Sequence, residues 1–212
     1  MIVCDGIIFD VDGTLWDSTG IVKDAWNNAI IKLGYPDPGI TADRLKGLFG
    51  LPMDDIIKDI LPNSTREERD RFTPIIYDYE DRYLNEKGGV LYPLIIETIA
   101  RISEKIPVFI VSNCQSGYIE LFMKKTDSEE YITDHLCPGD TGEFKTANIS
   151  AIIDKYGLEN PCYVGDTIMD ARACSEAGCP FVFASYGFGE VDDAEYVIDT
   201  PVDLLELLGM DN

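Results

Sequence analysis

Side chains able to do chemistry follow three separate apolar runs of the sequence. They are four carboxylates, one hydroxyl and one amide: Asp10 and Asp12, Ser112 and Asn113, and Asp166 and Asp170. A turn or a helix cap would use the same residue types, because their side chains hydrogen-bond to nearby backbone N–H groups. Clustered carboxylates, however, repel one another unless a cation lies between them. A set of metal ligands that are all oxygen atoms, with no His or Cys among them, favours a hard cation. These residues therefore predict a Mg²⁺ site.

Five short apolar runs, rich in Val, Ile and aromatic residues, indicate strands that are buried on both faces. The predicted strands are residues 6–11, 107–111, 162–164, 181–184 and 196–198. Helical patterns lie between them at residues 94–103, 146–156 and 168–176. This alternation predicts an α/β fold, a Rossmann-like doubly wound parallel sheet with helices on both faces. The carboxyl ends of parallel strands share one edge, where the polar residues should meet.

Residues 16–92 break this alternation. Helical patterns occupy residues 20–33, 42–48, 54–61 and 67–85, with Gly- and Pro-rich turns between them and no strand pattern. We therefore expect a catalytic core of residues 1–15 and 93–212, with an all-α domain of residues 16–92 inserted after the first strand. Pro93 suits the first turn of the helix that returns the chain to the core.

The polar strand ends and one lysine resemble the motifs of a known family. Asp10-Val-Asp-Gly-Thr14, Ser112-Asn113, Lys145 and Gly165-Asp166-x-x-x-Asp170 are similar, in order, to the four motifs of the haloacid dehalogenase (HAD) superfamily. The resemblance spans nearly the whole chain, because the helical insertion lies where the phosphoglycolate phosphatase-like branch carries its cap domain. It implies a Rossmann-like core with a helical cap and a phosphoric monoester hydrolase.

The resemblance also implies a role for each matching residue. Asp10 would attack phosphorus and form an aspartyl-phosphate. Asp12 would protonate the leaving alkoxide and then activate water. Lys145 would supply a fixed positive charge beside the phosphoryl group, and Ser112 and the Asn113 backbone would donate hydrogen bonds to it. Lys155 is the alternative lysine, but it lies late in its predicted helix.

The same resemblance implies a Mg²⁺ cofactor. The Asp10 carboxylate, the Asp12 backbone carbonyl and the Asp166 carboxylate would hold the ion. Asp170, one helical turn after Asp166, would complete or orient this shell. The ion offsets the repulsion between a carboxylate nucleophile and a phosphate dianion.

Single positions separate the branches of the superfamily. Phosphonatase-type members carry alanine at the position of Asp12, which disfavours that reaction. Mutases of the beta-phosphoglucomutase type carry a cap histidine shortly before an Ala-Trp pair, where this chain has Val22, and its one histidine, His135, lies outside the predicted cap. Hydrolysis of a small-molecule phosphate monoester is therefore the favoured function. A phosphosugar mutase and a non-catalytic metal- or phosphate-binding module are the alternatives, and the natural substrate stays open.

Substrate selection is expected from the inserted domain. Arg44 and Lys46 lie in a segment that resembles the cap loop of relatives, and they are either contacts for an anionic substrate or solvated helix-surface cations. The aromatic residues Trp16, Trp26, Tyr77 and Tyr79 are interpreted as the apolar core of the cap rather than as a substrate platform.

Composition excludes several other function classes. The 212 residues include 17 basic and 39 acidic side chains, a formal charge of −22, which disfavours binding to nucleic acid or to an anionic membrane. With 45% hydrophobic and 26% charged residues, the chain has the composition of a soluble globular protein. Its six cysteines form no CxxC pair, and we expect them to be reduced and mostly buried. The expected protein is cytoplasmic, and a monomer or a homodimer.

Overall fold

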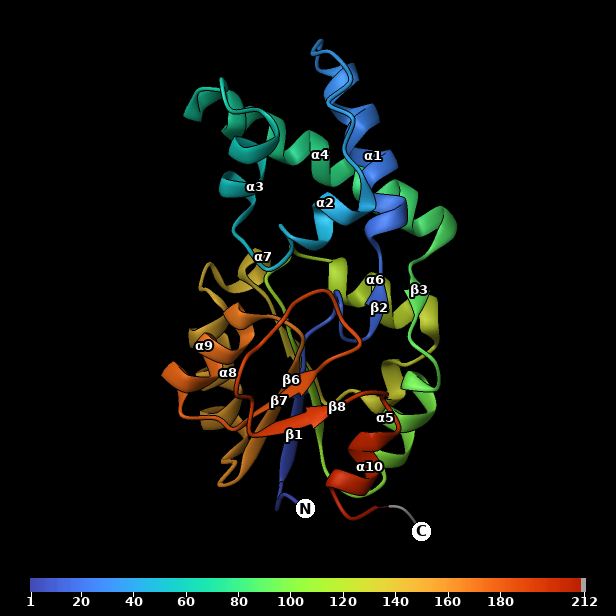
Figure 1. Ribbon diagram of the computed structural model, residues 1–212, viewed down its shortest axis with the longest axis vertical. Helices are drawn as coiled ribbons and strands as arrows, with labels where there is room; N and C mark the ends of the chain where they lie inside the picture. The colour runs from blue at the N-terminus through green and yellow to red at the C-terminus, as the bar shows by residue number, and fades with distance from the viewer. Residues whose placement is uncertain (211–212) are drawn as a thin grey trace. The chain divides into compact units, whose positions relative to one another are not determined.

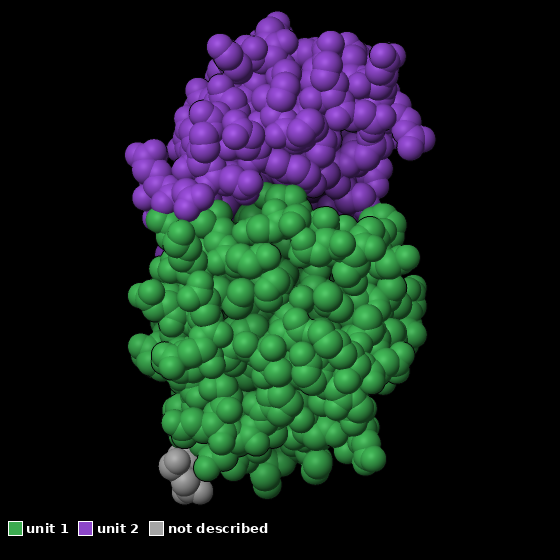
Figure 2. All heavy atoms as spheres, turned by 180° about the vertical axis from the view of Figure 1, so that it is seen from behind, with its two compact units in different colours: residues 1–16, 91–212 green, residues 17–90 purple. Residues whose placement is uncertain are grey.

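The computed structural model describes residues 1–210 and contains two compact units. Unit 1 combines Met1–Trp16 with the chain from Leu91 onward, and unit 2 is Asp17–Val90 (Figure 2). Each unit has its own buried apolar core. Among the described residues, no helix combines the length and the apolar character needed to cross a bilayer.

A six-stranded parallel sheet forms the centre of unit 1 (Figure 1). Its strands are β1 (Gly6–Phe9), β4 (Val108–Val111), β5 (Asp134–Leu136), β6 (Pro161–Gly165), β7 (Phe181–Ala184) and β8 (Tyr196–Ile198). Their order across the sheet is β5-β4-β1-β6-β7-β8, and every neighbouring pair is parallel. The order reverses at β1, so the chain fills one half of the sheet and then the other. This arrangement confirms the predicted Rossmann-like fold.

Helices cover both faces of the sheet, as a parallel sheet requires. The helices of unit 1 are α5 (Ile95–Ser103), α6 (Tyr118–Thr126), α7 (Pro138–Thr141), α8 (Lys145–Tyr156), α9 (Ile168–Ala177) and α10 (Asp203–Leu207), with a 3₁₀ turn, η1 (Glu129–Tyr131). Helices α8 and α9 lie on one side of the strands, and α5 and α10 lie on the other (Figure 1). The strands β1, β4 and β6 are therefore buried along their whole length.

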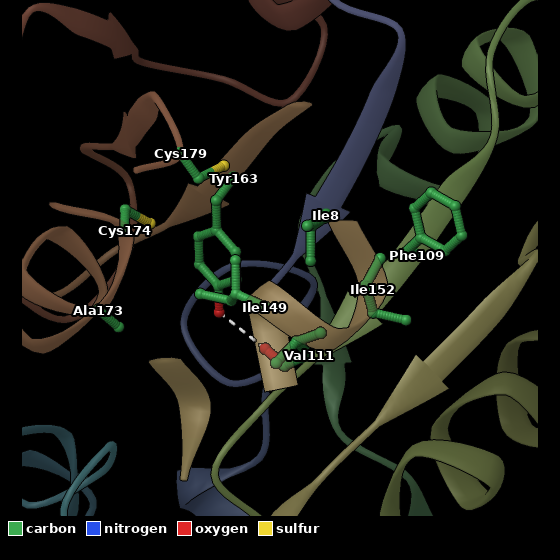
Figure 3. Packing of buried hydrophobic residues seen from close by; sticks show 9 residues of the cluster. All are labelled: Ile8, Phe109, Val111, Ile149, Ile152, Tyr163, Ala173, Cys174 and Cys179. Atoms are coloured by element: carbon green, nitrogen blue, oxygen red, sulfur yellow. Dashed lines mark hydrogen bonds between the residues drawn. The ribbon is translucent and has the colours of Figure 1, made fainter. Parts of the chain in front are cut away.

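The core beneath α8 and α9 fixes the end of the central strands. Figure 3 shows its members, which come from β1, β4, β6, α8, α9 and the turn that follows α9: Ile8, Phe109, Val111, Ile149, Ile152, Tyr163, Ala173, Cys174 and Cys179. The Tyr163 hydroxyl donates a hydrogen bond of 2.7 Å to the Val111 carbonyl, the dashed line of Figure 3. This contact satisfies the one polar atom of a large buried ring and joins β6 to β4, two of the strands that end at the site.

Unit 2 is helical, with α1 (Thr19–Lys32), α2 (Ala42–Lys46), α3 (Met53–Ile60) and α4 (Arg66–Lys87). A capping box begins α4, because the Thr65 hydroxyl accepts from the Glu68 N–H and the Glu68 carboxylate accepts from the Thr65 N–H. The buried Trp26 indole donates to Glu80 at 2.5 Å, and this contact joins α1 to α4. Trp26 thus belongs to the core of this unit, as expected.

Two features of the fold differ from the sequence-based prediction. The pairs Trp16–Asp17 (β2) and Val90–Leu91 (β3) form a two-stranded sheet, so the expectation of no strand within residues 16–92 is wrong at its two ends. The edge strand β5 and helices α6, α7 and α10 were not predicted. Strand β5 is only half-buried and reads Asp-His-Leu, so it lacks the apolar run that marks a central strand.

Candidate active site

The carboxylate of Asp10 lies directly after β1, at the point where the order of the strands reverses. Its backbone N–H donates to the Val164 carbonyl at 2.9 Å, which continues the pairing of β1 with β6 by one residue. Only 5% of Asp10 is exposed. The Ser112 hydroxyl, which follows β4, hydrogen-bonds to the same carboxylate. The parallel sheet therefore brings together two predicted site residues that follow the adjacent strands β1 and β4.

Lys145 is the cation of this site. It begins α8, and its Nζ lies 2.9 Å from Asp10 Oδ1 and 2.5 Å from Asp170 Oδ1. Burial by itself would lower the pKa of Lys145, but the two carboxylates raise it overall, so the amine stays protonated. The alternative lysine, Lys155, is exposed and pairs with Asp134 at 2.7 Å. Lys145, and not Lys155, therefore lies among the predicted carboxylates.

Asp170 is held by the first turn of α9. Its Oδ2 accepts from the Thr167 N–H at 3.0 Å and from the Thr167 hydroxyl at 2.6 Å, while the Thr167 hydroxyl accepts from the Asp170 N–H. This is a reciprocal capping box, which fixes the carboxylate relative to the helix. Its other oxygen, Oδ1, is the one that contacts Lys145. Asp170 therefore sets the position of the ammonium group.

Asp166 is the most deeply buried of the site carboxylates. One oxygen, Oδ2, accepts from the Phe188 N–H at 2.7 Å, and the other lies 3.3 Å from the Thr14 hydroxyl. Burial, together with the charges of Asp170 and Asp10, raises the pKa of Asp166 well above its usual range. Burial also raises the pKa of Asp10, although Lys145 partly opposes this shift. Burial therefore disfavours the charged forms of both carboxylates, even with Lys145 beside them.

The three buried carboxylates have the chemistry of a hard-cation site. One oxygen from each of Asp10, Asp166 and Asp170 lies within 4.8 Å of the others, and all three residues are buried. Oxygen donors of this kind suit Mg²⁺. Burial, the largest cause, and the neighbouring carboxylates together raise the pKa values of Asp10 and Asp166. The side chain of Asp12 is not part of this group.

Two glycines allow the backbone to approach Asp166 closely. A Cβ at Gly13, which has φ = +83°, would collide with the Asp166 carboxylate. A Cβ at Gly187 would collide with Asp166 Cβ and would lie 2.5 Å from the Gly13 carbonyl oxygen. The loop that contains Gly187 and Phe188 therefore closes over Asp166. The motif spacing gave no indication of the contact between Phe188 and Asp166, since it joins residues 22 apart.

Replacement of Gly187 by alanine should destabilise the protein. The added methyl group cannot be accommodated without moving Asp166 or the turn at Gly13, and overpacking of this kind costs about 1–3 kcal/mol. Urea denaturation measures the effect. Gly20→Ala is the matched control, because Gly20 is itself exposed, in the first turn of α1, with no atom near its Cβ position. Alanine there should stabilise the protein slightly. Equal midpoints for the two variants would contradict the tight packing around Asp166.

Asp12 lies in the turn after β1 and is half-buried. Its Oδ1 accepts from the Tyr118 hydroxyl at 2.9 Å and from Trp16 Nε1 at 3.2 Å. Trp16 belongs to unit 1, where its ring packs edge-on against Tyr118 and Phe122. The expectation that Trp16 forms part of the cap core is therefore wrong. Tyr118 was not identified from the sequence, because no motif relates it to Asp12.

Asn113, Arg44 and Lys46 were also singled out in the sequence. Asn113 directly follows Ser112 at the end of β4 and is half-buried. In unit 2, the Arg44 guanidinium donates to Asp59 with both Nε and an Nη, and Lys46 Nζ lies 3.3 Å from Asp17. Both cations thus already have carboxylate partners. This pairing favours the interpretation that they are helix-surface cations.

Comparison with known proteins identifies a family that the chain matches. The family model described as haloacid dehalogenase-like hydrolase matches residues 7–184. The phosphoglycolate phosphatase of Photorhabdus laumondii is 30% identical over 96% of this chain and 92% of its own. The phosphoglycolate phosphatase of Salmonella typhimurium is 27% identical over 97% of this chain and 92% of its own.

Solved structures share the fold. A haloacid dehalogenase-like hydrolase family protein from Streptococcus pneumoniae superimposes with a TM-score of 0.83 at 21% identity, covering 96% of this chain and 98% of that one. A protein described as a predicted phosphoglycolate phosphatase from Haemophilus somnus gives a TM-score of 0.85 at 21% identity, covering 96% and 97%. At this level of identity, the likeness concerns the fold alone.

Proposed function

The chain belongs to the haloacid dehalogenase-like hydrolase family, and on this basis we propose that it is a Mg²⁺-dependent phosphatase of small-molecule phosphate monoesters. The observation that carries the proposal is the buried Lys145 ammonium, which contacts Asp10 and Asp170 beside Asp166. Relatives named phosphoglycolate phosphatase support the reaction class. We also propose that unit 2, residues 17–90 of the 16–92 expected from the sequence, is the cap domain that selects the substrate.

The first step would transfer the phosphoryl group to Asp10. A carboxylate oxygen of Asp10 forms a bond to phosphorus as the bond from phosphorus to the ester oxygen breaks. Asp12 gives its proton to the departing oxygen, so that an alcohol leaves rather than an alkoxide. The products of this step are the alcohol, the aspartyl-phosphate and an ionised Asp12. Two carboxylates that lie two residues apart thus have different tasks.

The second step would return the enzyme to its starting state. The ionised Asp12 takes a proton from a water molecule as the water oxygen attacks phosphorus. The bond between phosphorus and Asp10 breaks, inorganic phosphate leaves, and the Asp10 carboxylate is restored. Asp12 is again protonated, so it can act as the acid in the next cycle.

Other residues would position the phosphoryl group and neutralise its charge. The Lys145 ammonium is held by Asp10 and Asp170, where it can donate to a phosphoryl oxygen without reorganising. The Ser112 hydroxyl and the Asn113 backbone N–H would donate further hydrogen bonds at the same edge of the sheet. Most of the acceleration of phosphoryl transfer comes from such positioning and electrostatics.

The carboxylate group described above fits a magnesium ion. Asp10, Asp166 and the Asp12 backbone carbonyl would hold the ion, and Asp170 would orient Lys145 and complete the surrounding hydrogen bonds. When bound, Mg²⁺ supplies Lewis-acid neutralisation of the phosphate charge. The Phe188 N–H and the Thr14 hydroxyl keep Asp166 in place for this role.

Assays of phosphate release test the proposal. Purified protein should release inorganic phosphate from at least one ester in a panel of phosphoglycolate, sugar phosphates, nucleoside monophosphates and pyridoxal phosphate. Release should stop when EDTA is added and return when Mg²⁺ is restored. The rate of release should fall at least about 10-fold in an Asp166→Asn variant, since metal sites lose function with their ligands. Mg²⁺ binding without release from any ester would favour a binding module. Isomerisation of a sugar phosphate without release would favour a mutase.

A further inference from the structure

Two buried aromatic side chains donate hydrogen bonds to the same oxygen of Asp12. The Tyr118 hydroxyl lies 2.9 Å from Asp12 Oδ1, and Trp16 Nε1 lies 3.2 Å from it. Only 1% of Trp16 and 2% of Tyr118 is exposed. Buried polar atoms of this kind are costly unless they are hydrogen-bonded. The two donors therefore hold Oδ1 in a defined place.

The donors are themselves fixed by packing. The ring of Trp16 meets that of Tyr118 at 5.9 Å with an interplanar angle of 80°, and that of Phe122 at 5.1 Å with an angle of 87°. These are edge-to-face contacts, the preferred geometry of aromatic pairs. Tyr118 and Phe122 lie one turn apart on α6, which presents both to the turn after β1. Rotation of Asp12 would break both hydrogen bonds, because the packed rings hold the two donors in place.

The chemistry of the donors distinguishes the two oxygens of Asp12. An indole N–H can donate a hydrogen bond but cannot accept one, so the oxygen that faces Trp16 must act as an acceptor. The Tyr118 hydroxyl donates to the same atom. When Asp12 is protonated, a proton on Oδ1 would have to compete with two donors that already point at it. The proton therefore belongs on Oδ2.

We propose that Trp16 and Tyr118 are positioning residues that reserve Oδ1 of Asp12 as an acceptor and make Oδ2 the oxygen that delivers the proton to the leaving group. This inference rests on the proposed phosphatase function. It adds a requirement that the catalytic motifs do not contain, because neither aromatic residue belongs to those motifs. It also assigns a purpose to a tryptophan four residues after Asp12 and to a tyrosine 106 residues away.

The effect of these residues should depend on the leaving group. An alkyl phosphate needs a proton on its departing oxygen, whereas para-nitrophenyl phosphate releases a stabilised phenolate that departs without one. The value of kcat/KM reports on the steps up to departure of the leaving group, since that step precedes the attack of water. Misplacing the proton of Asp12 should therefore lower kcat/KM for alkyl phosphates much more than for the nitrophenyl ester.

The Tyr118→Phe variant tests the proposal, because it removes one hydroxyl and leaves the ring in place. It should lower kcat/KM for the best alkyl phosphate by about 10-fold, a part of what general acid catalysis contributes, while kcat/KM for para-nitrophenyl phosphate changes little. Trp16→Phe should give the same selective loss, and the double variant a larger one. Phe122→Leu is the matched control, because Phe122 packs against Trp16 without contacting Asp12. It should affect both substrates equally.

The outcomes separate this inference from the proposed function. A parallel loss of kcat/KM on both substrates in Tyr118→Phe, with a thermal midpoint lowered as in Phe122→Leu, would mean that the cluster has only a structural role. Unchanged kinetics on both substrates would also overturn the inference, and wild-type turnover would leave the phosphatase assignment intact. If wild-type protein hydrolyses neither ester, the proposed function itself fails. Should Trp16→Phe not fold, Tyr118→Phe decides the matter alone.

Discussion

An Asp10→Asn variant is expected to fold like the wild-type protein and to lose turnover of any phosphate ester by at least about 10⁴-fold, as enzymes do when their nucleophile is removed. The amide nitrogen and oxygen of asparagine cannot form the acyl-phosphate that Asp10 is proposed to form. The substitution preserves the size of the side chain, and Lys145 keeps its contact with Asp170. Release of inorganic phosphate and circular dichroism measure activity and folding.

A second Asp→Asn variant controls for the change of charge. Asp43 is exposed in the first turn of α2, and Asp43→Asn should retain full activity. If Asp10→Asn folds and keeps activity within about 10-fold of the wild type, less than a nucleophile contributes, then Asp10 does not form the bond to phosphorus. Equal losses in the two variants would point to a general effect of charge.

Lys145→Met is expected to lower both activity and stability. The variant leaves the buried carboxylates of Asp10 and Asp170 without their shared cation, and removal of one partner from a buried ion pair costs about 3–5 kcal/mol of unfolding free energy. The loss of a fixed charge beside the phosphoryl group should also reduce kcat by about 10²–10³-fold. Urea denaturation of the metal-free protein, together with phosphate-release assays, measures both effects.

The loss of stability should depend on pH with a definite sign. Burial raises the pKa of Asp10 even with Lys145 present, and removing the cation raises it further. A carboxyl group whose pKa is higher in the folded state binds protons more tightly there, so lowering the pH favours folding. The difference in unfolding free energy between wild type and Lys145→Met should therefore shrink as the pH falls.

Lys155→Met is the matched control for this prediction. Lys155 also forms an ion pair, with Asp134, but the lysine is largely exposed, and exposed pairs contribute little to stability. Its denaturation midpoint and its activity should stay close to those of the wild type. If Lys145→Met were as stable and as active as Lys155→Met, the buried contacts with Asp10 and Asp170 would have neither of the effects assigned to them.

The sequence predicted the architecture because the central strands carry a strong local signal. β1, β4 and β6 are apolar along their length, and helical patterns separate them in the sequence. β5 was missed because an edge strand that is half-buried can carry Asp and His. The short strands β2 and β3 have two residues each, too few for any period to be visible.

Two kinds of signal named the candidate site residues in advance: some directly follow strands, whereas Lys145 and Asp170 were implied by the family resemblance. Asp10, Ser112 and Asp166 each end an apolar run, and topology alone brings such ends to one edge. Trp16, Tyr118 and Phe188 could not be identified in this way. Their contacts with the site carboxylates depend on side-chain packing and on a loop that returns from a distant part of the chain.

Capture of the covalent intermediate tests the central claim most directly. Borohydride reduces an acyl-phosphate to an alcohol, so an aspartyl-phosphate becomes homoserine, which mass spectrometry can locate in the peptide that contains residue 10. Enzyme quenched into borohydride during turnover of its best substrate with Mg²⁺ should carry homoserine at position 10 and should lack it when substrate is omitted. Turnover without homoserine at position 10, or homoserine at another carboxylate, would contradict the assignment of Asp10 as the nucleophile.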